Sequence, residues 1–173
     1  MDERERIDEA AESWARIVPD LDVVTMRTAL LLARVTALGA KHIESAFADE
    51  GLSAGEFDVL ASLMHVPAHT SKPSVLARTG MLSPAGMTHR LDLLEQAGLV
   101  ERRPDPADRR STLIVLTEAG EAKAIDAART HVAAEAEILQ VLSAGKQAEL
   151  RQLLETMLDA YAMANTGRTD TEN

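Results

Sequence analysis

The chain has 173 residues, a net charge of −10, no cysteine, and 46% hydrophobic but only 2% aromatic residues. This length suits one domain or two small ones, and a core so poor in aromatic side chains must be built from Ala, Leu, Val and Met, as in bundles of closely packed helices. The missing cysteines exclude disulfides and a thiol-based redox switch. No uninterrupted apolar run approaches the roughly 18 residues of a membrane span, so we expect a soluble, cytoplasmic protein without membrane contact.

Two helices are predicted at the start of the chain. A short, highly charged helix over residues 3–18 has one apolar face and ends at Pro19. A longer helix over residues 22–50 ends at Gly51. Their apolar faces exceed what a central module of about sixty residues covers, so they are expected to contact another molecule.

Three shorter helices follow. Ser53–Glu56 forms a capping box, which starts a helix running to about residue 65. Proline near the first position then opens helices over 73–79 and 84–97, and Gly98 ends the second of these. The last two helices are predicted to form a helix-turn-helix.

The helix over 84–97 has two unlike faces. Met87, Leu91 and Leu94 recur at helical spacing and form its inner face. Its outer face begins with small and polar groups, which let a helix lie close in a DNA major groove. The residues that we predict to contact DNA here are Ser83, Ala85, Gly86, Thr88, His89 and Arg90.

A β-hairpin is predicted next, with strands over 99–103 and 111–116. The proline-rich segment 104–108 is expected to lack regular structure. The residues that we place at the hairpin tip are Asp108, Arg109 and Arg110. Such a ribbon can reach the minor groove beside a helix bound in the major groove.

The end of the chain predicts two more helices. Thr117 caps a long, alanine-rich helix, and a second helix starts at Ser143 and continues to about Ala164 with a wide apolar stripe. The partner that accounts for both terminal regions with the fewest assumptions is a second copy of the chain. The expected organisation is therefore 1–50 and 118–165 as dimerisation helices, 51–117 as the DNA-binding lobe, and 166–173 as a flexible tail.

The charge is unevenly spread along the sequence. Residues 59–110 carry seven basic and five acidic side chains, whereas the remainder carries a net charge of −12. No acidic residue occurs between Asp58 and Asp92. This window favours nucleic acid as a partner, and the acidic total predicts weak non-specific binding and loss of affinity with salt.

From Leu82 to Gly120 the sequence follows the pattern L-S-x-x-G-M-T-x-R-L-x-x-L-E-x-x-G-L-V-x-R-x-P-D-P-x-D-R-R-x-x-x-I-x-L-T-x-x-G. It closely resembles the winged helix-turn-helix core of the MarR family of transcription regulators, over roughly Leu52 to Gly120. The resemblance implies a mainly α fold with a small β-hairpin, and a homodimer held by its terminal helices on double-stranded DNA. It also implies that Asp108 braces Arg110.

A second set of residues resembles the urate-responsive, UrtR/PecS-like branch of this family, in which an extra N-terminal helix is typical. The matching residues are Trp14, Asp58, Arg90 and Arg102 or Arg103. This resemblance implies a small-molecule effector, urate or another small anion, held by guanidinium groups. The alternative is structural, with Trp14 as a packing anchor, Asp58 as a carboxylate near a helix N-terminus, and arginines that bind phosphate.

The sequence therefore predicts a regulator that binds a palindromic operator as a homodimer and is released by a ligand, most simply a repressor. The alternative is a winged-helix module that binds protein and no DNA. We expect no enzyme, because no nucleophile with a base, phosphate loop or metal cage is present, and we expect no cofactor.

Overall fold

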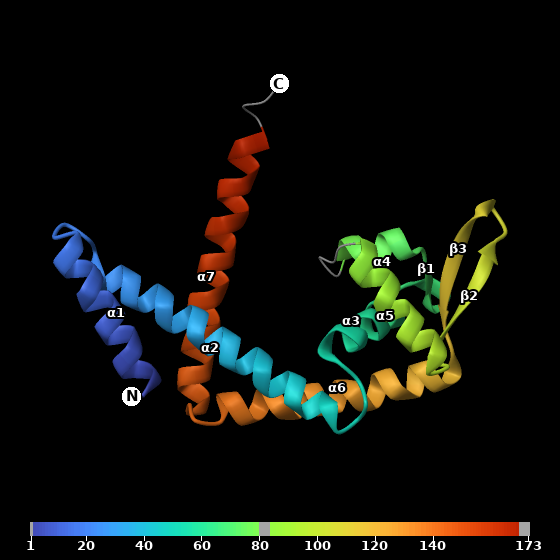
Figure 1. Cartoon of the computed structure of the whole chain (residues 1–173), viewed down its shortest axis with the longest axis horizontal. Helices are drawn as coiled ribbons and strands as arrows, with labels where there is room; N and C mark the ends of the chain where they lie inside the picture. The colour runs from blue at the N-terminus through green and yellow to red at the C-terminus, as the bar shows by residue number, and fades with distance from the viewer. Residues whose placement is uncertain (1, 80–83, 170–173) are drawn as a thin grey trace. The chain divides into compact units, whose positions relative to one another are not determined.

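The computed structural model describes residues 2–79 and 84–169 (Figure 1). The chain divides into two compact units, Met1–Ala134 and Glu135–Asn173. It is mainly helical with one small sheet, which confirms the predicted fold class. In chain order the elements are α1 (Glu3–Ile17), α2 (Val23–Ala48), α3 (Ala54–Met64), the 3-10 turn η1 (Pro67–His69), β1 (Thr70–Ser71), α4 (Pro73–Thr79), α5 (Pro84–Gln96), β2 (Val100–Asp105), β3 (Asp108–Leu116), α6 (Glu118–Leu139) and α7 (Ala144–Thr169).

The sheet is antiparallel, with strand order β1-β3-β2. The prediction that segment 104–108 lacks regular structure is wrong, because β2 continues to Asp105 and β3 begins at Asp108. Pro104 fits within β2 because this strand lies at the sheet edge, where one side of the backbone needs no partner. The β2–β3 hairpin, called the wing below, is therefore longer than expected, and the short strand β1 was not predicted.

Helices α3, α4 and α5 pack with the three strands around one hydrophobic core; we call this group the lobe. Met87, Leu91 and Leu94 are at most 2% exposed, which confirms the predicted inner face of α5. The predicted capping box at the start of α3 is also present. Ser53 N–H donates to the Glu56 carboxylate at 2.8 Å, and Glu56 N–H donates to the Ser53 hydroxyl at 3.2 Å.

The end of α2 is fastened to α6. The Glu50 carboxylate accepts a hydrogen bond from the Thr130 hydroxyl and pairs with Lys123 at 3.0 Å. These two donors lower the pKa of Glu50. The rings that stack together among α2, α3 and α6 are Phe47, Phe57 and His131. The end of α2 is thus held to α6 by charge, and α2, α3 and α6 are joined by ring contacts.

Helix α1 runs antiparallel along α2. Asp8 pairs with Arg27 at 2.8 Å, and Glu3 pairs with Arg34 at 2.5 Å. The Arg34 guanidinium lowers the pKa of the Glu3 carboxyl. Because α1 runs antiparallel to α2, the end of α1, which carries Trp14, lies beside the start of α2, remote from the lobe (Figure 1).

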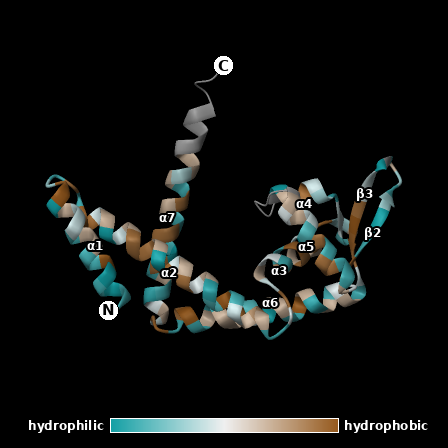
Figure 2. Cartoon of the chain, viewed as in Figure 1, coloured by the Kyte–Doolittle hydropathy of each residue, from teal (hydrophilic) through white to brown (hydrophobic). Residues whose placement is uncertain are grey.

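Helix α2 is long and apolar enough, by length and composition, to cross a membrane, with a mean hydropathy of 1.4 over 18 residues. The sequence-based search for an uninterrupted apolar run missed it, because Arg27, Arg34 and Lys41 interrupt the helix. The highly charged α1 covers one side of α2 with ion pairs, which lipid would not replace. Large apolar side chains nevertheless stay exposed on α2 (Figure 2), namely Val24, Leu31, Leu32, Val35 and Leu38.

In the second unit, α7 continues to Thr169, beyond the predicted end at Ala164. Part of the predicted flexible tail is therefore helical, since no proline stops the helix there; residues 170–173 lie outside the described residues. The exposed apolar side chains of α7 include Leu153, Leu154, Met157, Leu158 and Tyr161.

Candidate nucleic-acid interface

The outer face of α5 is open to solvent at its start. Ala85, Thr88 and His89 are exposed, and Gly86 is half-buried. Ser83 lies outside the described residues. Small side chains at this end of the helix leave the backbone accessible to a bulky partner, which is the arrangement that the sequence predicted for the approach to a major groove.

Arg90 turns from α5 toward the first turn of α3, where its guanidinium lies against Gly55. A methyl group on Gly55 would come within 2.2 Å of Arg90 Cζ, so only glycine leaves room for this position. Asp58, on the same helix as Gly55, is exposed. Among the side chains that the structure describes, neither Arg90 nor Asp58 has an ion-pair partner. Two opposite charges on neighbouring helices are therefore available to a ligand.

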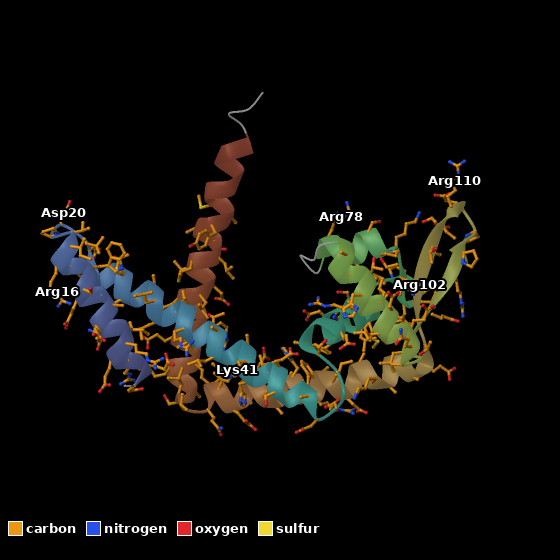
Figure 3. All side chains as sticks on the ribbon, viewed as in Figure 1. Arg16, Asp20, Lys41, Arg78, Arg102 and Arg110 are labelled. Atoms are coloured by element: carbon orange, nitrogen blue, oxygen red, sulfur yellow. The ribbon has the colours of Figure 1, made fainter. Side chains whose placement is uncertain are left out.

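The wing tip presents Arg110, which is exposed and points away from the lobe (Figure 3). Asp108 was expected to brace the side chain of Arg110. In the structure its carboxylate instead accepts a hydrogen bond from the Arg110 backbone N–H at 3.0 Å. The brace therefore orders the turn and leaves the guanidinium of Arg110 projecting from the tip. The side chain of Arg109 lies outside the described part of the structure.

Arg78 was not assigned a role from the sequence. It is exposed near the end of α4, and in Figure 3 it points away from the lobe on the same side as Arg110. The one signal in the sequence was its place in the acid-free window. Its position adds a cation to the face that carries the start of α5 and the wing tip.

Arg102 ties the base of the wing to α5. Its guanidinium pairs with Asp92 at 2.6 Å and with Glu95, and its backbone N–H donates to Glu95 at 3.3 Å (Figure 3). Burial lowers the pKa of Arg102, but the two carboxylates prevail and raise it above its usual value. A ligand at Arg102 must therefore compete with two carboxylates.

Arg103 lies on the other face of β2, where it pairs with Glu101. Neighbouring residues of a strand point to opposite faces of the sheet. The structure therefore separates the two wing-base arginines that the sequence left as alternatives: Arg102 faces α5, and Arg103 faces away from it.

Trp14 does not join the other predicted ligand residues within one chain. It lies beside the start of α2, whereas Asp58 follows the end of that helix. A helix of 26 residues is about 39 Å long at 1.5 Å per residue. Within one protomer, α2 therefore holds Trp14 and Asp58 apart.

The model of the MarR family matches residues 52–112. The transcriptional regulator PecS of Dickeya dadantii is 37% identical over 149 residues, which cover 86% of this chain and 90% of that protein. The Mycobacterium tuberculosis MarR family protein Rv2887, solved in complex with p-aminosalicylic acid, superposes with a TM-score of 0.61 at 33% identity, over 73% of this chain and 95% of that one.

The Streptomyces coelicolor regulator Sco3205, solved in complex with DNA, has the same fold, with a TM-score of 0.70 at 20% identity over 81% of this chain and 89% of that one. The fold, the exposed outer face of α5 and the similarity to PecS along most of both sequences agree with one another. The chain belongs to the MarR family of DNA-binding transcription regulators.

Proposed function

We propose that the protein acts in the cytoplasm as a homodimeric repressor, which occupies a palindromic operator and leaves it when a small anion binds. One observation carries the DNA part. The exposed, small-residue start of α5 shares a lobe with an arginine-tipped wing, and Arg78 and Arg110 point away on the same side. A helix with little bulk approaches base edges, and an arginine on a ribbon fits a narrow minor groove.

The DNA contacts that we propose come from α4, α5 and the wing. The hydroxyl groups of Thr88 and Ser83 are proposed to contact phosphates, and the imidazole of His89 to contact a base edge. The full set is Arg78, Ser83, Ala85, Gly86, Thr88, His89, Arg90, Asp108, Arg109 and Arg110. In this set Asp108 acts on the backbone of the turn rather than on DNA.

The dimer is supported by the apolar surface of the terminal helices. Val24 is 77% exposed and Val35 58% exposed on α2, and Leu153 is 59% exposed and Leu158 68% exposed on α7. Soluble monomers rarely expose apolar faces of this extent. A second copy offers the same faces, and a twofold pair presents two α5 helices to successive major grooves.

The effector that we propose is urate or a similar planar anion. Asp58 and the half-buried Arg90 lack ion-pair partners among the described residues, and Arg102 lies at the wing base with two carboxylates that an anion would displace. The similar protein Rv2887 was solved with an aromatic carboxylate. Trp14 can join this site only from the partner protomer. Binding releases DNA when the ligand prefers a spacing of the two lobes that does not fit the operator.

Selection from random-sequence duplexes tests the DNA part of this proposal. We expect the purified protein to enrich an inverted repeat, with half-sites about 10 base pairs apart or a multiple of that distance. Affinity should fall steeply with salt. If no duplex is enriched even at low salt, the protein is a winged-helix module that binds protein instead.

A calorimetric titration with urate tests the effector. We expect saturable binding in the micromolar range, release of the selected duplex, and at least about tenfold weaker binding by Asp58→Asn. If the duplex binds but urate gives no heat, the effector class is wrong, whereas the DNA-binding function stands.

Gly55→Ala tests the position of Arg90 without touching its charge. The added methyl group must push the Arg90 guanidinium away, while alanine in a helix is itself stabilising by up to about 1 kcal/mol. We expect urate binding to weaken about as much as in Arg90→Ala, with thermal unfolding unchanged or slightly raised. The double variant should bind urate no more weakly than Arg90→Ala alone. Additive losses of urate affinity would show that Gly55 acts independently of Arg90.

A further inference from the structure

Asp105, at the end of β2, is a buried charge. It is 6% exposed, and among the residues that the structure describes it alone combines burial with an ionisable side chain. A carboxylate withdrawn from water is costly unless opposite charge and hydrogen bonds compensate it. Its contacts therefore indicate what holds this part of the wing in place.

Two sets of contacts compensate Asp105. Within the turn, its carboxylate accepts a hydrogen bond from the backbone N–H of Ala107 at 2.8 Å. From outside the wing, Lys72 Nζ lies 2.9 Å from the other carboxylate oxygen. Lys72 lowers the pKa of Asp105, and Asp105 raises the pKa of Lys72, so both stay charged at neutral pH.

Lys72 stands at a junction of the fold. It follows β1 and directly precedes α4, the first helix of the helix-turn-helix. Asp105 lies at the opposite edge of the sheet, next to the bulge that opens the wing tip. The pair therefore joins the start of α4 to the wing tip, across the intervening strand β3.

The contacts continue to the tip. Asp105 holds the backbone N–H of Ala107, and the next residue, Asp108, holds the backbone N–H of Arg110. The position of the backbone determines where a side chain begins. Through this series of contacts, the position of the Arg110 side chain at the wing tip therefore depends on α4. Arg102 fixes the base of the same hairpin to α5, through ion pairs with Asp92 and Glu95.

We propose that Lys72 and Asp105 form a clamp that positions the wing tip relative to the helix-turn-helix, and that tight operator binding requires this ion pair. Both are positioning residues, which act through the wing rather than by contact with DNA. The proposal rests on the DNA-binding function argued above and adds two residues to it that the sequence did not single out.

Electrostatics alone predicts the opposite effect for Asp105. Removing a negative charge from the DNA-binding lobe and freeing Lys72 would strengthen attraction to phosphate. Loss of the clamp would weaken binding, because a mobile wing must be ordered when it docks. The sign of the change caused by Asp105→Asn therefore separates the two explanations.

The experiment measures binding of the duplex that the wild-type dimer selects, over a range of salt concentrations. Lys72→Met and Asp105→Asn remove one charge each and keep the shape, and the asparagine oxygen still accepts from the turn. We expect each variant to bind about tenfold more weakly, and the double variant to bind no more weakly than either single one. Lys72→Arg should retain most of the affinity, since it preserves the pair.

The controls separate positioning from other roles. Lys146→Met removes a lysine from an exposed ion pair with Glu149 on α7 and should leave binding unchanged. Unchanged or tighter binding by Asp105→Asn overturns the proposal. The proposal is also overturned if the duplex affinity of Lys72→Met depends less on salt than that of the wild type, because this would show that Lys72 contacts phosphate. If the wild-type protein selects no duplex, the DNA-binding function itself fails rather than the clamp.

Discussion

Arg110→Ala should weaken binding to the selected operator by about 100-fold at moderate salt. The exposed guanidinium projects from the wing tip. Under the proposed function, its loss removes one minor-groove contact from each protomer of the dimer. An arginine contact of this kind contributes about 1–3 kcal/mol, so two copies account for the expected change. A fluorescence anisotropy titration with labelled duplex measures it.

Two further variants test whether the loss of affinity is specific to the guanidinium at the wing tip. Arg110→Lys keeps the charge but loses the planar fork, and we expect it to fall between wild type and Arg110→Ala. Arg129→Ala removes another exposed arginine, on α6, where it pairs with Asp126 on the helix surface, and should not change affinity. An unchanged affinity in Arg110→Ala would refute the minor-groove role of the wing tip.

Gly120→Ala should lower the free energy of unfolding by about 3 kcal/mol. A methyl group on Gly120 would lie 1.9 Å from the Leu99 carbonyl oxygen and 2.8 Å from Leu116 Cδ1. The carbonyl cannot retreat easily, because it also accepts hydrogen bonds from the backbone and hydroxyl of Thr117, both at 3.1 Å. The start of α6 and the wing base must therefore separate. Denaturant unfolding at a fixed protein concentration measures the loss.

Gly145→Ala is the matched control. It makes the same substitution near the start of α7, where nothing lies within 4 Å of the added methyl group. Alanine is the better helix former, so this variant should be stabilised by up to about 1 kcal/mol. A Gly120→Ala protein as stable as wild type would show that α6 and the wing base are not in the close contact described here.

Local signals in the sequence were sufficient for the helices of the lobe. Proline at the first position and glycine after the last placed α5 within one residue of its observed end, and helical spacing identified its three buried residues. The Ser53–Glu56 capping box placed the start of α3. Caps and periodicity depend on residues within a few positions of one another, so they are visible without a structure.

Contacts between distant residues were not predictable in the same way. Nothing near Lys72 in the sequence indicates Asp105. Their proximity depends on the strand order of the sheet, in which strand β1 has only two residues. The same limit applies to Arg90 and Gly55, which meet only when α3 and α5 pack. Trp14 and Asp58 were grouped by a family resemblance, which carries no information on distance; within one protomer, a helix of 26 residues separates them.

The distribution of aromatic side chains has a spectroscopic consequence. The chain contains one tryptophan and one tyrosine, and both lie on terminal helices, Trp14 on α1 and Tyr161 on α7, whereas the lobe contains only phenylalanine. Trp14 is 51% exposed, so its emission should shift to shorter wavelength when another surface covers α1. Tryptophan emission thus follows assembly of the terminal helices, and the lobe is optically silent. A change in tryptophan emission therefore reports on the terminal helices and not on unfolding of the lobe.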